Sequence, residues 1–216
     1  MILAPSLLAC DFLNIQNEIE KIKNHKNLWL HLDVMDGHFV PNLSFGKVVF
    51  EKIGRISNYP LDAHLMVTNP EFYIEDYKNI GLHNFTFHLE ASDDCLSLIK
   101  KAKKYYPSVG ISIKPNTDVN QLSSDILQNI DLILIMSVEP GFGGQSFMPE
   151  ALLKVQSLVQ KKKEKNYSYQ IQIDGGINLE TAKLAIKAGV DNLVAGSFIF
   201  NNQDPNNIIK KIFELG

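Results

Sequence analysis

Eight apolar runs of strand length recur along the chain and alternate with segments that carry apolar residues at helical spacing. Most of the runs are continuously apolar, which is typical of parallel strands buried on both faces. In a chain of 216 residues, eight such units predict an α/β fold, a single (β/α)8 TIM barrel over residues 1–216, with an open doubly wound sheet as the alternative. The predicted strands cover residues 2–7, 28–35, 61–67, 84–89, 109–114, 132–138, 169–174 and 192–196.

Helices are predicted between these strands, over residues 14–25, 96–105, 149–165, 179–188 and 205–215, with a further one beginning at Pro70 behind an Asn69 cap. Asn178 or Thr181 is expected to cap the helix at 179–188, and Gly189 to end it. The helices after the second and fifth strands are expected to be short or irregular.

Polar side chains that can bind metal or transfer protons stand at or near the carboxyl ends of three predicted strands. His31 and Asp33 share one face of the second strand, together with Met35. His64 lies on the third strand, with Asp62 and Met66 on its face, and Asp174 ends the seventh strand. Each has an ordinary alternative, a self-satisfied buried pair, a core histidine or a turn-forming aspartate. A barrel would bring all of them together, which favours a metal or acid/base site.

Glycine-rich segments follow the last three predicted strands: VEPGFGGQSF at 138–147, DGGIN at 174–178 and AGSFIF at 195–200. Glycine lets backbone amides approach an anion closely, and the start of a short helix after the eighth strand would add its positive end. Any one of these motifs is explained by turn formation. Their occurrence on three consecutive loops favours phosphate binding.

Composition limits the remaining functions. The net charge is −3, and the lysines at 161–163 and 165 are most simply a solvated helix face, so we expect no nucleic-acid partner. Cys10 and Cys95 are too few for a disulfide framework and suit a reducing, cytoplasmic location. No apolar stretch reaches the length of a membrane span, and the first residues enter a strand, so neither a membrane association nor a signal peptide is expected.

The chain resembles the ribulose-phosphate 3-epimerase family from end to end. The blocks that carry the resemblance, in order, are APSLLACDF, HLDVMDGHFVPN, HLMV, TFHLEA, IKPNT, MSVEPGFGGQSF, IDGGIN and AGSFIF. Asn116 departs from the family pattern, which often has glycine there, but it is not a residue to which chemistry is assigned.

The resemblance implies an enzyme that interconverts D-ribulose 5-phosphate and D-xylulose 5-phosphate in the pentose phosphate pathway, through an enediolate. It implies one divalent metal ion, Zn²⁺, Fe²⁺, Mn²⁺ or Co²⁺, with His31, Asp33, His64 and Asp174 as ligands. Asp33 is then the proton acceptor and Asp174 the proton donor. Such chemistry needs an acid and a base on opposite faces of the reacting carbon, and positive charge to stabilise the enediolate oxygen.

By the same resemblance, other residues contact the phosphosugar substrate and the methionines at 35, 66 and 136 line the site, while His88 is expected in a second layer. The substrate-binding residues expected are Ser6, His64, Gly141, Phe142, Gly143, Gly144, Asp174, Gly175, Gly176, Gly196 and Ser197. A homo-oligomer is also implied, as a dimer or a hexamer. Two alternatives stay open: a sister epimerase acting on a hexulose 6-phosphate such as D-allulose 6-phosphate, and a catalytically silent phosphosugar-binding barrel.

Overall fold

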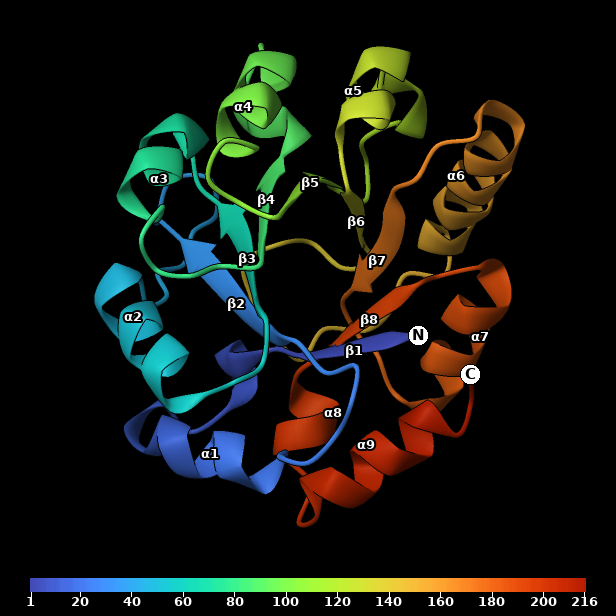
Figure 1. Cartoon of the computed structure of the whole chain (residues 1–216). Helices are drawn as coiled ribbons and strands as arrows, with labels where there is room; N and C mark the ends of the chain where they lie inside the picture. Colours follow the sequence, from blue (N-terminus) through green and yellow to red (C-terminus); the bar gives the residue numbers. More distant parts are fainter.

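The computed structural model describes residues 1–216, and each predicted apolar run forms a strand whose ends differ from the prediction by no more than two residues. All strand pairs are parallel (Figure 1). The strands are β1 (Ile2–Pro5), β2 (Leu30–Met35), β3 (Leu61–Met66), β4 (Asn84–His88), β5 (Ser108–Ile113), β6 (Leu132–Met136), β7 (Gln170–Asp174) and β8 (Asn192–Ala195).

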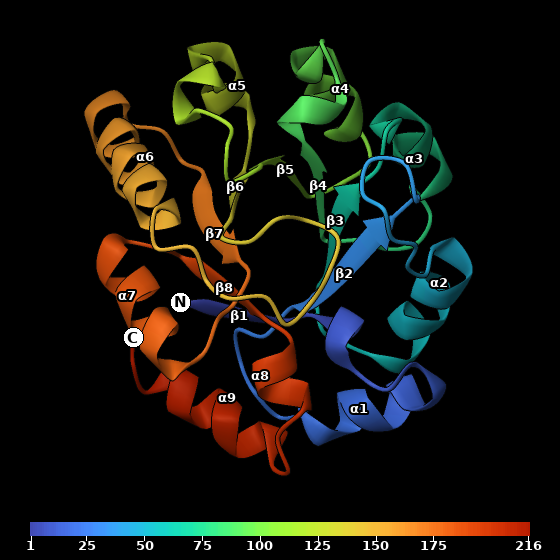
Figure 2. The same cartoon turned by 180° about the vertical axis from the view of Figure 1, so that it is seen from behind.

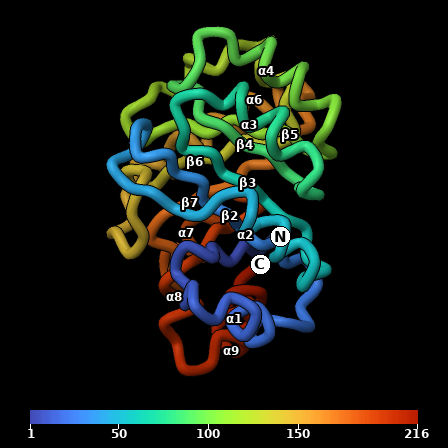
Figure 3. The backbone as a smooth tube through the Cα atoms, turned by 90° about the vertical axis from the view of Figure 1, so that its left-hand side faces the viewer, coloured from blue at the N-terminus to red at the C-terminus, as the bar shows by residue number.

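The sheet runs in the order β1-β8-β7-β6-β5-β4-β3-β2, and its two edge strands meet. Isolated parallel bridges pair Leu3 with Leu28 and Ser6 with His31, so β1 lies beside β2 and the ring closes as a barrel. The barrel is therefore confirmed over the open sheet. The two ends of the chain lie side by side near β1 (Figures 1 and 3).

Helices surround the barrel and follow most of the strands (Figure 2). The α-helices are α1 (Ile15–Lys21), α2 (Lys47–Ile56), α3 (Pro70–Asp76), α4 (Cys95–Ala102), α5 (Ser124–Asn129), α6 (Ala151–Lys165), α7 (Leu179–Ala188), α8 (Ser197–Phe200) and α9 (Pro205–Phe213). Short 3-10 turns are η1 (Leu7–Ala9), η2 (Phe12–Asn14), η3 (Leu89–Ala91) and η4 (Val119–Gln121). None of the helices combines the length and apolarity needed to cross a bilayer.

The helix ends follow the predicted capping chemistry. Asn69 accepts from the Phe72 amide at the start of α3. At the start of α7, Asn178 accepts from the Thr181 amide while the Thr181 hydroxyl accepts from the Asn178 amide, so both predicted caps act together. Gly189 ends α7 with a φ of +103°.

Two helix predictions are corrected. The first helix stops at Lys21 instead of His25, because Asn24 and Asn27 adopt positive φ and turn the chain into β2. The helix after the second strand is a regular one of 10 residues, α2, whereas α5 after the fifth strand is short, as expected. Phe50 and Ile53 are the buried residues of α2, and its valines, isoleucines and Gly54 have low helix propensity, which obscured the helix in the sequence.

Alternate residues of the strands face opposite environments. On β2, Leu30, Leu32 and Val34 belong to the large core between the barrel and its helices. His31 and Asp33 face the barrel interior, as predicted, and both are buried. A smaller apolar cluster fills another part of the interior, centred on β6 and β8 (Leu132, Leu134, Met136 and Val194).

Candidate active site

Four ligand-type side chains meet inside the barrel: Asp174 ends β7, whereas His31 is the second residue of β2 and Asp33 and His64 stand within their strands. His31 and Asp33 come from β2, His64 from β3 and Asp174 from the end of β7. One ligand atom from each lies within 4.8 Å of the others, a grouping that could hold a metal ion. The sequence-based expectation that the fold brings these residues together is confirmed.

His31 offers one free ring nitrogen to this cluster. Its Nδ1 is 2.8 Å from the Asp62 carboxylate, while the buried Nε2 has no hydrogen-bond partner. That Nε2 lies 3.4 Å from an Asp33 oxygen and 3.8 Å from an Asp174 oxygen. A buried nitrogen left without a partner carries an energetic cost, and a cation bound between it and the two carboxylates would remove that cost. The donor set therefore fits a divalent metal.

His64 approaches the same cluster through its other ring nitrogen. Its Nδ1 lies 3.1 Å from an Asp33 oxygen and 3.8 Å from an Asp174 oxygen. Its Nε2 is 2.9 Å from the Nε2 of His88. His88 thus lies directly behind His64, in the second layer where it was expected.

The surroundings of Asp33 and Asp174 shift the pKa values of the two carboxyl groups in opposite directions. Burial would raise the pKa of Asp33, but His31 and His64 outweigh it and hold the pKa well below its usual range. Burial and the charge of Asp33 raise the pKa of Asp174 to about 6, despite the opposing effect of both histidines. Two carboxyl groups whose pKa values differ in this way are suited to act as a base and an acid.

His31 must lose a proton before it can bind a metal. Burial lowers its pKa, but Asp33 and Asp62 outweigh burial and raise the pKa of His31 well above its ordinary value. A proton therefore competes with a metal ion for the same nitrogen.

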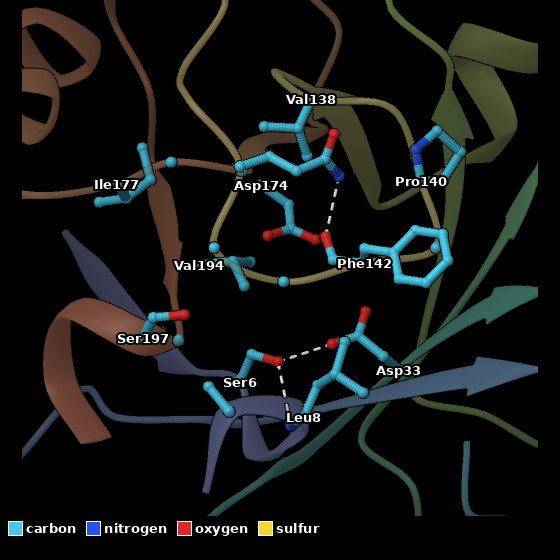
Figure 4. A pocket seen from close by; sticks show the side chains of 18 of the residues that line it. Ser6, Leu8, Asp33, Val138, Pro140, Phe142, Asp174, Ile177, Val194 and Ser197 are labelled. Atoms are coloured by element: carbon cyan, nitrogen blue, oxygen red, sulfur yellow. Dashed lines mark hydrogen bonds between the residues drawn. The ribbon is translucent and has the colours of Figure 1, made fainter. Parts of the chain in front are cut away.

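Ser6 connects the first strand to this cluster. Its hydroxyl donates to an Asp33 oxygen over 2.6 Å and accepts from the Leu8 amide (Figure 4). The bridge between Ser6 and His31 in the barrel seam fixes this approach. Ser6 therefore orients one Asp33 oxygen while the other faces the histidines.

A cavity of about 260 Å³ opens beside the four ligand-type residues. Asp33 and Asp174 both line it, from different sides (Figure 4). Its remaining wall contains Ser6, Met35, Met66, Met136, Gly141, Phe142, Gly143, Gly144, Gly175, Gly176, Gly196 and Ser197, among others, but no lysine or arginine. An anion in this cavity would have to be held by backbone amides and hydroxyl groups.

The loops around the cavity require glycine at specific points. Gly175 has a φ of +121°, and a Cβ there would lie 2.5 Å from a Val138 methyl. Gly176 has a φ of +64°, and a Cβ would lie 2.5 Å from the Phe147 amide nitrogen. The long loop between β6 and α6 crosses the mouth of the barrel (Figure 2). Asn42 from the loop after β2 donates to its Gly141 carbonyl, over 2.8 Å.

Two carboxylates that sequence reasoning did not assign support the histidines. Asp62 contacts His31 and also accepts from Asn84 and Gln172, over 2.6 and 2.7 Å. Glu90 lies 3.2 Å from Nδ1 of His88. The alternation of side chains placed Asp62 beside His64, but only the register of β2 against β3 sets it opposite His31.

The chain is similar to known proteins over most of its length. A model of the family described as "Ribulose-phosphate 3 epimerase family" matches residues 2–200. A ribulose-phosphate 3-epimerase of Treponema pallidum is 44% identical over 199 residues, covering 92% of this chain and 91% of that protein. One of Mycobacterium leprae is 42% identical over 205 residues, covering 95% and 90%. The cytoplasmic isoform of Oryza sativa is 40% identical over 213 residues, covering 97% and 92%.

Solved structures resemble the chain in fold. The 3-hexulose-6-phosphate synthase of Salmonella typhimurium superposes with a TM-score of 0.69 at 15% identity, covering 100% of this chain and 98% of that one. The orotidine 5'-phosphate decarboxylase of Pyrococcus horikoshii gives 0.69 at 14% identity, with the same coverage. At such identities the likeness concerns the barrel alone. The family model and the curated relatives establish more, and the chain belongs to the ribulose-phosphate 3-epimerase family.

Proposed function

We propose that this protein interconverts D-ribulose 5-phosphate and D-xylulose 5-phosphate by moving a proton at the carbon next to the carbonyl. The observation that carries the proposal is the pair Asp33 and Asp174, which reach one cavity from different strands with their pKa values pushed apart. Inversion of a carbon centre requires a base on one face and an acid on the other.

Each carboxylate takes one role in each direction. In one direction Asp33, held ionised, removes the proton and leaves an enediolate, and Asp174 delivers a proton to the opposite face. In the reverse direction the two roles exchange. The Ser6 hydroxyl donates to one Asp33 oxygen and so orients the carboxylate, while the other oxygen faces His31 and His64.

His31, Asp33, His64 and Asp174 are proposed to hold one divalent cation. When bound, Zn²⁺, Fe²⁺, Mn²⁺ or Co²⁺ supplies positive charge that stabilises the enediolate oxygens, and this donor set suits all four. The nitrogen of His31 that lacks a partner supports this assignment. Met35, Met66 and Met136 line the cavity and would exclude water from the enediolate.

The substrate is proposed to lie with its phosphate among the glycine loops. Gly141, Phe142, Gly143 and Gly144 follow β6, Gly175 and Gly176 follow β7, and Gly196 and Ser197 follow β8. The wall of the cavity contains no cationic side chain, so backbone amides and the Ser197 hydroxyl would bind the phosphate. Ser6, His64 and Asp174 would contact the sugar.

The two alternatives are less well supported. A hexulose 6-phosphate substrate is not favoured, because the curated relatives named above are pentulose-phosphate enzymes. A silent binding barrel would need no pair of carboxylates with opposite pKa shifts.

The decisive experiment is an epimerase assay on purified protein with ribulose 5-phosphate and with allulose 6-phosphate, before and after chelation. We expect turnover of the pentulose phosphate, its loss with chelator, and recovery on adding a divalent metal. Faster turnover of the hexulose phosphate would contradict the proposal that the substrate is a pentulose phosphate. Full activity in the chelated, metal-free protein would contradict the proposal that activity requires a metal.

Cellular location and assembly stay predictions. The name of the rice relative specifies a cytoplasmic isoform, which supports a cytoplasmic location. A homo-oligomer is proposed from family membership, and light scattering of the purified protein measures it directly.

A further inference from the structure

A chain of polar contacts runs from the metal-type cluster to a carboxylate outside it. Nε2 of His64 lies 2.9 Å from Nε2 of His88, and Nδ1 of His88 lies 3.2 Å from a Glu90 oxygen. Both imidazoles are fully buried. Glu90 stands in η3, directly after β4, and its other oxygen accepts from the Lys114 amide and the Thr117 hydroxyl.

Glu90, the carboxylate at the end of this series of contacts, determines which group donates and which accepts in each hydrogen bond. Glu90 already accepts two hydrogen bonds, as an ionised carboxylate does, and an ionised carboxylate can only accept from His88. The proton of a neutral His88 therefore lies on Nδ1, and its Nε2 must accept from His64. His64 then carries its proton on Nε2, and its Nδ1 lone pair points into the cluster.

The consequence at the cluster is a pair of facing acceptors. Nδ1 of His64 and an Asp33 oxygen lie 3.1 Å apart, and with the proton of His64 on Nε2 neither can donate to the other. Two such acceptors are compatible only when a cation or an additional proton lies between them. The hydrogen-bond chain behind His64 thus prepares this nitrogen for a cation.

We propose that His88 and Glu90 are positioning residues that hold His64 as the Nε2–H tautomer and so aim its Nδ1 at the metal. This inference rests on the metal site of the proposed function. Asp62 orients His31 in a corresponding way but leaves the other ring nitrogen available, because it contacts Nδ1 and leaves Nε2 without a partner. The two histidines therefore present different nitrogens to one point, and neighbouring groups that orient metal ligands in this way commonly affect affinity by 10- to 100-fold.

The test compares His88→Gln with His88→Leu. A glutamine can still accept from His64 and donate to Glu90, whereas leucine, of similar bulk, can do neither. His25→Leu is a matched control, because it removes an imidazole that contacts Asn206 and precedes the amino end of β2. Each protein is stripped of metal and titrated with Co²⁺, and the dissociation constant and visible absorption spectrum are recorded, with circular dichroism and Tm as folding controls.

We expect His88→Leu to weaken Co²⁺ binding by about 10- to 100-fold and to alter the spectrum, while His88→Gln and His25→Leu remain near the wild type. Equal affinity and spectrum in the folded leucine variant would overturn the proposal, as would equal losses in the leucine and glutamine variants. Nitrogen-15 NMR of the wild-type histidines gives a metal-independent reading: His88 is expected as the Nδ1–H tautomer, and the Nε2–H tautomer would refute the inference. A wild-type protein that binds no Co²⁺ but shows the expected tautomer would refute the metal site instead.

Discussion

The interior faces of β2 and β3 and the loops that follow β6–β8 contribute to the same cavity in different ways. The strands supply side chains: Asp33 lines the cavity, and His31 and His64 belong to the same cluster, each with polar neighbours and almost no exposure. The loops supply backbone, with glycine at several positive φ angles, and Phe142 among them is 55% exposed. Ionisable side chains are thus concentrated where proton transfer is proposed, and the proposed phosphate site is formed mainly by backbone amides.

The two regions are therefore expected to respond differently to substitution. A buried charge that loses its partner is costly, and the neighbouring groups of the strand region depend on one another. On the loop side the interior holds an apolar cluster that includes Leu134, Met136 and Val194 and extends to Val138 of the loop after β6. We therefore expect substitutions in the strand region to alter chemistry and metal content, and substitutions in the loops to alter substrate affinity.

The largest effect is expected from the two carboxylates. Asp33→Asn or Asp174→Asn should lower kcat by about 1000-fold or more, because each direction of the reaction needs both a base and an acid. In a variant that still holds metal, exchange of substrate hydrogen with solvent should persist from one epimer only. Equal exchange from both epimers in metal-replete Asp174→Asn protein would show that Asp174 moves no proton, so metal content is measured on the same sample.

The next effect concerns metal content. His64→Ala removes a proposed ligand from the cluster and should lower both the bound metal, measured by elemental analysis, and activity by about 100-fold, the scale at which even supporting groups of metal sites act. His31→Ala should behave alike. His38→Ala, an exposed histidine on the loop after β2, is the matched control and should retain metal. Full metal occupancy in His64→Ala would remove His64 from the ligand set.

A smaller effect is expected in the loop region from Gly143→Leu. A Cβ at this position would be 3.9 Å from the Ser197 hydroxyl with nothing nearer, so the fold should tolerate it. The larger side chain would enter the proposed phosphate site and raise KM by about tenfold, or ~1.4 kcal/mol of binding. Steady-state kinetics with ribulose 5-phosphate and with ribulose check this, because the ratio of kcat/KM for the phosphorylated substrate to kcat/KM for the other should fall. An unchanged preference would place the phosphate elsewhere.

The smallest effect is a pH dependence of stability in the strand region. Burial would raise the pKa of Glu90, but its bonds from His88, Thr117 and the Lys114 amide outweigh burial and lower it from 4.5 to about 2. A carboxyl group with a lowered folded-state pKa stabilises the protein above its unfolded pKa, and that contribution is lost as the pH falls from 4.5 towards 2.

Urea unfolding of the wild type and of Glu90→Gln between pH 6 and pH 3 measures this contribution. We expect the wild type to lose about 1 kcal/mol more than the variant over that range, a value reduced to allow for the partly exposed side chain. Parallel curves for the two proteins would show that Glu90 carries no such charge-dependent contact.

Much of the fold could be predicted because it depends on local patterns. Continuous apolar runs identified all eight strands, and capping residues such as Asn178 identified helix starts. The helix α2 was the main exception, because its sequence KVVFEKIGRI is rich in β-branched residues and contains Gly54, all of low helix propensity. His31, Asp33, His64 and Asp174 were recognisable because ionisable side chains in apolar strands are uncommon without a role.

The sequence by itself determined the order of the strands along the chain, the chemical types at their ends and the glycines between them. Only the tertiary structure decided which ring nitrogen each histidine presents. That choice depends on Asp62 lying opposite His31 across the β2–β3 register, and on His88 lying behind His64 with Glu90 beyond it. The reason is physical: a hydrogen bond requires two groups within about 3 Å, and which groups come that close is fixed by strand register and barrel closure, which no local pattern encodes.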